Sequence, residues 1–204
     1  MTAVETRIQL LDAAEQLIAE RGYRGTSVRA ITELAGANLA AVGYHFGSKA
    51  ELVSEVARRV IEPITGAQLV GLEQLLSRHP DPSIAQLVEA FVGPMFDGIS
   101  NRGEGGARAS RLIVMILTDP AVEMRGWTGV ADAEVRERFY AEFERALPGI
   151  SAGELWFRMR GILAVVAVDR VEFTAQRLER ERDDAARDWA ITFLAAAVSA
   201  PASR

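Results

Sequence analysis

Hydrophobic residues recur at every third or fourth position along most of the chain, which is the spacing of amphipathic helices. The first such stretch covers residues 4–21, and Gly22 follows it as a glycine at a helix C-terminus should. Two short helices are expected over 27–35, where Thr26 can cap the first turn, and over 39–45, where Asn38 can do so. A longer helix begins at Ser48, and we expect it to end at Pro63 or to continue past it with a kink.

The rest of the chain predicts five more helices. Ser83 with Gln86 and Ser151 with Glu154 have the spacing of capping boxes, as Ser48 with Glu51 does. The predicted helices cover about 84–95, with a kink near Pro94, then 107–117, 135–147, 151–170 and 183–199, with loops at 103–106 and 119–129. Residues 162–168 are rich in β-branched side chains, but no other segment would pair with them as a strand. We therefore expect an all-α protein of about nine helices.

The first three helices form a unit of their own, over residues 1–48, in front of a larger helical unit over 49–204. Two short helices joined by a tight turn around Gly36, with another helix packed behind, describe a helix-turn-helix. The second short helix would enter a major groove roughly 12 Å wide and needs a slim outer face. Leu39 and Val42 can supply its inner face, whereas Ala40, Ala41 and Gly43 keep its outer face thin.

Charge is distributed unevenly over a chain whose net charge is −5. Residues 1–60 carry seven basic and seven acidic side chains, and residues 61–204 carry 16 and 21. Within 22–50, Arg24, Arg29 and Lys49 stand against Glu33 alone, a local charge of +2. The helix N-termini expected at Thr26–Ser27 and at Ser48–Lys49 add unpaired backbone N–H groups, which attract phosphate. A small basic stretch thus lies on an otherwise acidic chain, although chance often produces such patches.

The residues of this motif resemble those of a known family. The string Ala35-Gly36-Ala37-Asn38-Leu39-Ala40-Ala41-Val42-Gly43-Tyr44-His45-Phe46-Gly47-Ser48-Lys49, followed by Glu51-Leu52, is similar to the DNA-binding domain of the TetR/AcrR family of bacterial transcriptional regulators. The upstream segments Arg21-Gly22-Tyr23 and Thr26-Ser27-Val28-Arg29 fit the same pattern. The resemblance covers residues 7–62. Gly43, where the family often has an aromatic or polar residue, and Thr32, where alanine is usual, depart from it.

The resemblance implies a set of DNA contacts. Double-stranded DNA with a palindromic operator is the expected partner. The resemblance implies phosphate contacts for Thr26, Ser27, Tyr44 and Lys49. It implies groove-facing or backbone-near positions for Asn38, Leu39, Ala40, Ala41 and His45, and Arg29 completes the DNA-binding set. Each has a structural alternative: Tyr44 could pack in the core, Arg29 could pair with Glu33, and Lys49 could be a solvated charge.

The larger unit is expected to form a homodimer and to bind a small, hydrophobic effector, as the resemblance implies. The last two long helices would pair across a two-fold axis through Leu155, Ile162, Trp189, Phe193 and Ala196. Residues that could line an effector pocket are Phe91, Met95, Phe96, Met115, Ile116, Phe139, Trp156 and Met159. The alternative for both sets is that these side chains fill the protomer core.

Other classes of function have less support in the sequence. The chain has no cysteine and only two histidines, His45 and His79, and no nucleophile–base pair is recognisable. We therefore expect no enzyme activity, no cofactor and no metal site. No signal peptide or membrane-spanning run is recognisable, which favours a cytoplasmic protein. A repressor is the main expectation; an activator of the same fold and a helical interaction module without DNA binding remain alternatives.

Overall fold

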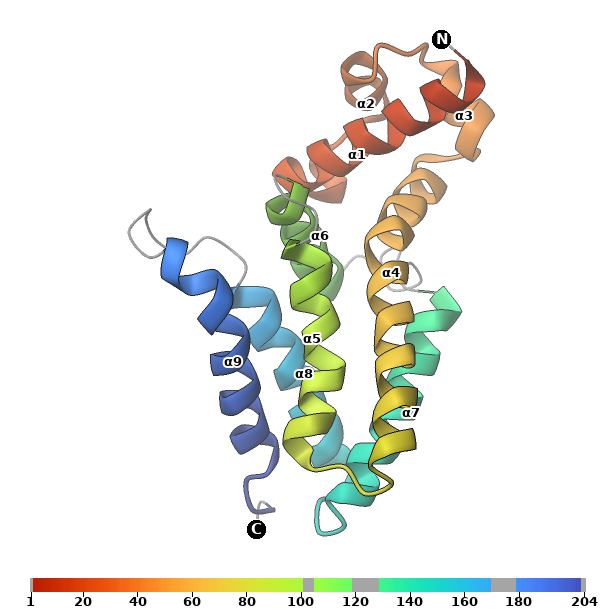
Figure 1. Cartoon of the computed structure of the whole chain (residues 1–204). Coiled ribbons are helices and arrows are strands. Elements are labelled where there is room, and N and C mark those ends of the chain that lie inside the picture. The colour runs from red at the N-terminus through yellow and green to blue at the C-terminus, as the bar shows by residue number, and fades with distance from the viewer. Residues whose placement is uncertain (1, 101–104, 119–128, 170–178, 203–204) are drawn as a thin grey trace.

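The computed structural model describes residues 2–100, 105–118, 129–169 and 179–202, and these residues form nine α-helices with no strand. The helices are α1 (Ala3–Gly25), α2 (Val28–Leu34), α3 (Ala40–Phe46), α4 (Lys49–Arg78), α5 (Ile84–Ser100), α6 (Gly106–Thr118), α7 (Gly129–Ala146), α8 (Ala152–Asp169) and α9 (Glu179–Val198). The predicted all-α fold is therefore confirmed. Helices α1–α3 form a small unit at one end, and the C-terminus lies at the other (Figure 1).

The glycine turns of the small unit are where the sequence predicts them. Gly22 has φ +73° and interrupts α1 near its end, and Gly36, with φ +61°, makes the turn between α2 and α3. The capping residue of α2 is Ser27 rather than Thr26, because the Ser27 hydroxyl accepts the N–H of Ala30. Apolar residues of α1 from Leu10 to Ile18 are buried, but Val4 and Ile8 at its start are exposed.

Helix α4 runs without interruption from the small unit into the body. It passes through Pro63, which is the second of the two predicted alternatives, and continues to Arg78. Proline removes one backbone donor in this region. Thr65, in the next turn, is buried and its hydroxyl donates to the carbonyls of Ile61 and Glu62. One helix thus belongs both to the unit that carries the motif and to the body.

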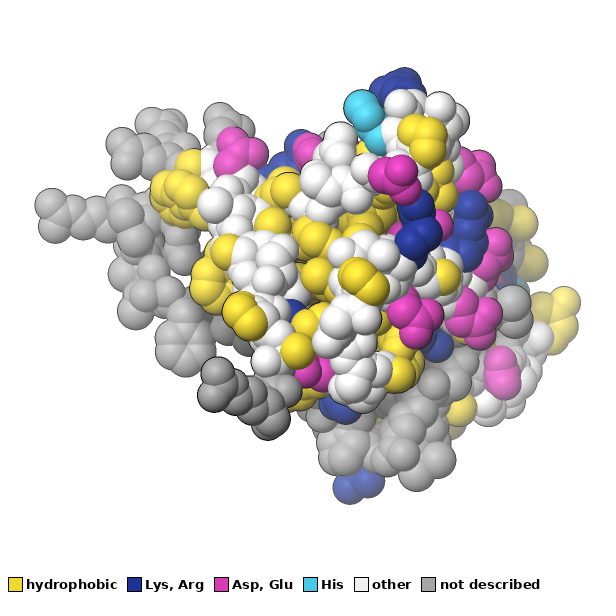
Figure 2. Space-filling model, turned by 90° about the horizontal axis from the view of Figure 1, so that it is seen from below, with side chains coloured by type: hydrophobic (Ala, Val, Ile, Leu, Met, Phe, Trp, Pro, Cys, Tyr) yellow, Lys and Arg dark blue, Asp and Glu magenta, His cyan; other side chains and the backbone are white. Residues whose placement is uncertain are grey.

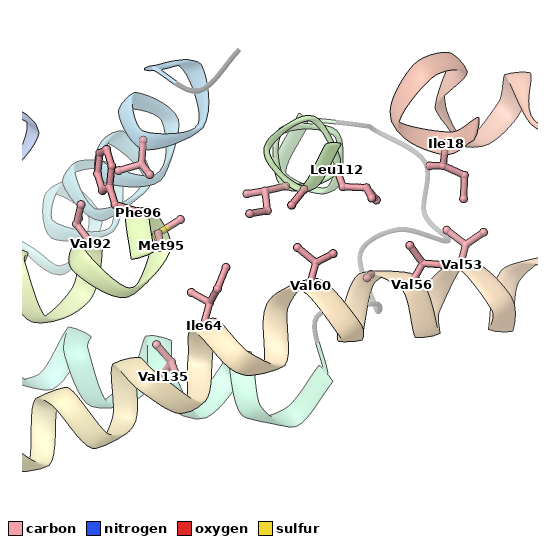
Figure 3. Packing of buried hydrophobic residues seen from close by; sticks show 14 of the residues in the cluster. Ile18, Val53, Val56, Val60, Ile64, Val92, Met95, Phe96, Leu112 and Val135 are labelled. Carbon is pink, nitrogen blue, oxygen red and sulfur yellow. The ribbon is translucent and has the colours of Figure 1, made fainter. Parts of the chain in front are cut away.

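A single hydrophobic core follows the inner face of α4. Val53 and Val56 point towards Ile18 of α1, and Val60 points towards Leu112 of α6 (Figure 3). Further along, Ile64 faces the part of α5 that carries Met95 and Phe96 (Figure 3). Helix α6 also contacts α1 directly. The small unit is therefore packed onto the body through buried apolar contacts.

The body consists of α5–α9 packed around the C-terminal half of α4. Helix α5 lies between α4 and α9, and α7 and α8 pack on each other (Figure 1). Pro94 lies inside α5, as predicted, and the predicted capping box of Ser83 with Gln86 is present at its start. The β-branched segment 162–168 is helical. The predicted loop at 119–129 falls mainly on residues outside those described. No described helix is long and apolar enough to cross a membrane.

Candidate nucleic-acid interface and effector pocket

The outer face of α3 is open to solvent. Tyr44 is 82% exposed, and Ala40 and Gly43 beside it are exposed too. Val42 and Phe46 form the inner face and are buried. Leu39 does not join them, because it is 58% exposed at the start of the helix. The prediction of Leu39 as an inner-face residue is therefore wrong, and its exposure is compatible with the groove-facing role that the resemblance implies.

The start of α3 differs by one residue from the prediction. Leu39 occupies the capping position and makes no side-chain capping bond. The exposed Asn38 precedes it, and its Oδ1 accepts the N–H of Ala40 at 2.9 Å. Asn38 therefore still ties down the first turn, while Leu39 and Ala40 are left at the surface. Ala41 is half-buried beneath them.

The predicted phosphate contacts around α2 have different surroundings. Thr26 is only 2% exposed, and its hydroxyl donates to the carbonyls of Leu17 and Gly22 at 3.1 and 2.9 Å. Its side chain fastens α1 to the motif and offers no donor to a phosphate. Ser27 is exposed at the N-terminus of α2. Arg29 is exposed and pairs with Glu33, with Nε 2.9 Å from Oε1, so that its guanidinium remains at the surface.

Lys49 is held by the end of α1. Its Nζ donates to the carbonyl oxygen of Tyr23 at 2.6 Å and lies 4.0 Å from the centroid of the Tyr23 ring. Partial burial lowers the pKa of the Lys49 ammonium. An ammonium has three donors, so donors remain for a phosphate beside the one that Tyr23 accepts. The ring of Tyr44 meets that of His45 edge-on, with centroids 4.9 Å apart.

Ion pairs hold α1 against the first half of α4. Arg7 pairs with Glu55, and its guanidinium carbon lies 5.2 Å from the ring centroid of Phe46 in α3. Arg59 pairs with Asp12 at 2.5 Å. These contacts link α1 to α4 and α1 to α3. Movement of the start of α4 should therefore carry α3 with it.

A cavity of about 310 Å³ lies among α5, α7 and α8. Three of the predicted pocket residues line it, namely Phe91, Trp156 and Met159. Phe139, Met95 and Phe96 do not line it and are buried in the protomer core, and Met115 is a half-buried residue that packs against this core. The side chain of Ile116 lies outside the described part of the structure. The lining residues that the sequence analysis missed are Ala133, Arg136, Glu137, Tyr140, Arg160 and Leu163.

The cavity has mostly apolar walls and charged groups among them. The rings of Tyr140 and Trp156 lie 6.2 Å apart, and the Tyr140 hydroxyl donates to the carbonyl of Ala152 at 3.3 Å. Arg136 pairs with Asp132 one turn earlier on α7. An apolar cavity of this size with a few polar groups is typical of a small-molecule site. Its residues come from α5, α7 and α8, which is why spacing along one helix could not reveal them.

Exposed aromatic side chains mark α8 and α9. Phe157, Trp189 and Phe193 are all at least 60% exposed, and Ala196 is exposed too. Leu155 and Ile162 are buried within the protomer, so their prediction as dimer contacts is wrong. The sequence analysis did not select Phe157 as a dimer contact, because α8 carries apolar residues on several faces. Seen from the end that carries the C-terminus, hydrophobic side chains predominate on the α9 side, whereas charged ones gather on the α4 and α7 side (Figure 2).

Family models match both parts of the chain. Residues 10–56 match "Bacterial regulatory proteins, tetR family", and residues 89–197, more than half of the chain, match "Tetracyclin repressor-like, C-terminal domain". The chain belongs to the TetR family. The helix-turn-helix of α2 and α3 lies within the segment that the first of these models matches.

Curated relatives of this TetR-family chain are similar mainly at its N-terminal end. The transcriptional repressor KstR2 of Rhodococcus jostii is 42% identical over 60 residues, which are 29% of each chain. The regulator TtgR of Pseudomonas putida is 47% identical over 51 residues, 25% of this chain and 24% of TtgR. The transcriptional activator FasR of Mycolicibacterium smegmatis is 32% identical over 101 residues, 50% of this chain and 43% of FasR. The chain thus matches less than half the length of these relatives.

Solved structures share the whole architecture. The TetR family regulator PfmR from Thermus thermophilus superposes with a TM-score of 0.63 at 18% identity, over 96% of both chains. HlyIIR, a hemolysin II transcriptional regulator, has a TM-score of 0.61 at 17% identity, over 95% of this chain and 99% of HlyIIR. At such identities the likeness concerns the fold alone.

Proposed function

We propose that the protein is a homodimeric repressor that binds a palindromic operator and leaves it when a small, largely apolar effector binds. The observation that carries the DNA-binding part is the orientation of α3. Val42 and Phe46 anchor this helix to the core, while Tyr44 and the small residues beside it face solvent. A helix with a thin, open face and an anchored back fits a major groove.

Dimerisation is supported by the exposed aromatic residues of α8 and α9. Phe157, Trp189 and Phe193 expose apolar area that a second copy would cover. Two copies related by a two-fold axis would present two α3 helices to half-sites one helical turn apart, about 34 Å. A regulator that binds chromosomal DNA acts in the cytoplasm, and this localisation is part of the proposal.

The cavity among α5, α7 and α8 is the proposed effector site. Its apolar walls favour a small hydrophobic molecule, and Arg136, Glu137 and Arg160 can select for polar groups on it. Release of DNA by about a hundredfold requires the effector to favour the released state by roughly 2.7 kcal/mol. Repression is supported by the names of the KstR2 relatives, whereas FasR is named as an activator. Catalysis forms no part of the proposal.

The test is selection of genomic DNA fragments by the purified protein, followed by affinity measurements at several salt concentrations. We expect an enriched palindrome and an affinity that falls steeply with salt. Arg29→Ala should weaken binding and reduce the salt slope, whereas Arg78→Ala at the far end of α4 should change neither. A folded dimer that enriches no fragment at low salt would refute the proposal. A reporter placed behind the palindrome distinguishes repression from activation.

A further inference from the structure

A buried amide lies in the otherwise apolar contact between α4 and α5. Gln68 is 4% exposed and occupies the helix face that also buries Ile64 and Leu72. Its Nε2 donates to the backbone carbonyl of Phe91 at 2.6 Å. Burying an amide costs free energy unless it is hydrogen-bonded, and a leucine would fill this position without that requirement. The amide therefore adds a directed bond to the apolar packing between the two helices.

The acceptor of this bond lies in the part of α5 that is interrupted by proline. Pro94 has no N–H to donate to the carbonyl of Ala90, four residues earlier. A helix bends most readily where such a bond is missing. The Ala90 carbonyl faces Gly71 of α4, since a Cβ built on that glycine would lie 3.9 Å from the oxygen. Gln68 thus bonds to α5 at the turn where α5 can change its direction.

Phe91 is also a wall of the proposed effector cavity. Its side chain lines that cavity together with Tyr140, Trp156 and Met159, and its ring packs on Phe139 with centroids 4.9 Å apart. One residue therefore both lines the cavity and is bonded to α4 through its carbonyl. A continuous path of contacts therefore leads from the cavity through Phe91 to Gln68.

We propose that Gln68 is the positioning residue that transmits occupancy of the cavity to α4, and thereby to α3. The inference rests on the proposed function, since it names the link between effector and DNA. It predicts that the Gln68 amide is needed for coupling between the two sites and dispensable for either site alone. A purely structural glutamine would instead change stability and leave the coupling intact.

The experiment replaces the unidentified effector by a side chain built into the cavity. Ala133 lines the cavity from α7, so Ala133→Trp fills it, with Ala133→Phe as a smaller alternative should the first not fold. Ala141→Trp places the same ring at an exposed position on the same helix. Gln68→Met removes the amide and keeps the side-chain length, and Gln74→Met makes the same change at an exposed position of α4.

Two measurements are made on each variant and on the double variants. The first is affinity for the enriched DNA fragment. Ala133→Trp should weaken it about tenfold in the wild-type and Gln74→Met backgrounds and less than twofold in the Gln68→Met background. The second is hydrogen exchange of the backbone amides in the first turns of α4, without DNA. Ala133→Trp should speed this exchange unless Gln68 has been replaced.

The outcomes distinguish failure of the role of Gln68 from failure of the proposed function. An equal loss of affinity in the Gln68→Met and wild-type backgrounds overturns the role of Gln68. So does a filled cavity that changes neither affinity nor exchange. If the wild type selects no DNA, the proposed function fails, and the exchange measurement alone then decides for or against Gln68. A rescue completes the test: Gly71→Ser brings a hydroxyl towards the Ala90 carbonyl and should restore coupling to Gln68→Met.

Discussion

The ammonium of Lys49 lies 2.6 Å from the carbonyl oxygen of Tyr23 and 4.0 Å from the centroid of its ring. Lys49 is the first residue of α4, and Tyr23 lies after the break that Gly22 makes in α1. The contact therefore closes the small unit by joining the beginning of one helix to the end of another. It also leaves a partly buried positive charge beside the surface proposed to meet DNA.

Replacing Lys49 should affect both stability and DNA binding. Lys49→Met removes one charge-assisted hydrogen bond and one cation–π contact, which should lower the free energy of unfolding by about 1 kcal/mol. It should also weaken binding to all DNA sequences alike, because a phosphate contact carries no base specificity. Urea denaturation and fluorescence anisotropy measure the two effects. Lys49→Arg keeps the charge. If that variant retains the affinity for non-specific DNA, the contribution of Lys49 to this affinity comes from its charge.

Tyr44 and Phe46 are aromatic neighbours whose substitutions should have opposite effects. Tyr44→Ala should leave the melting temperature within a degree or two and reduce operator affinity, since this side chain is almost fully exposed. Phe46→Ala should cost about 3 kcal/mol of stability, because it leaves a cavity in the core. Calorimetry and operator titration separate the two. A strongly destabilised Tyr44→Ala would contradict the orientation of α3.

A charge on the exposed aromatic face should separate the proposed dimer. Phe193→Asp would bury an unpaired carboxylate between two copies, which disfavours association without disturbing the protomer. Sedimentation velocity should show a shift from dimer to monomer, with loss of operator binding. Val70→Asp is the matched control, because Val70 is an exposed apolar residue on α4. Identical sedimentation of the wild type and Phe193→Asp would place the interface elsewhere.

Two glycine substitutions test how closely α4 and α5 pack. A Cβ at Gly98 would lie 2.8 Å from Cγ1 of Ile64, so Gly98→Ala should destabilise the protein by about 1–3 kcal/mol. Gly66 lies in α4 with nothing near its Cβ position, and Gly66→Ala should stabilise by about 0.5–1 kcal/mol through helix propensity. Thermal unfolding of both variants checks the pair. Equal melting temperatures would mean that the two helices are less closely packed.

Local sequence signals predicted the motif well because they act over a few residues. Glycines with positive φ at Gly22 and Gly36 and the Ser83–Gln86 capping box follow from backbone geometry alone. Thr26 shows the limit of such reasoning. A threonine before a helix has the features of a capping residue, but this one donates its hydroxyl to Leu17, nine residues earlier, and only the tertiary structure determines that bond.

The body was harder to predict because its apolar residues cover more than one face of a helix. Leu155 and Phe157 of α8 are both apolar, yet Leu155 is buried and Phe157 is exposed. The spacing along α8 gives no preference between them, since the choice depends on where α7 and α9 pack. For the same reason, the sequence predicted only some of the residues that line the cavity. Phe91 and Met159 were predicted from size and type, whereas Arg160 and Ala133 line it only by their position in three dimensions.

Because α4 is unbroken, a small tilt of this helix in the body becomes a larger displacement at its N-terminal end. From Gln68 to Lys49 the helix advances about 28 Å at 1.5 Å per residue. If the helix moves as one rod through Pro63, a tilt of about 5° around the Gln68 end swings the other end by roughly 2.5 Å. In a two-fold dimer the two swings would be opposite in direction, so the separation of the reading helices could change by up to about 5 Å. A slight displacement deep in the body would then be enough to set the two helices out of step with successive turns of the duplex.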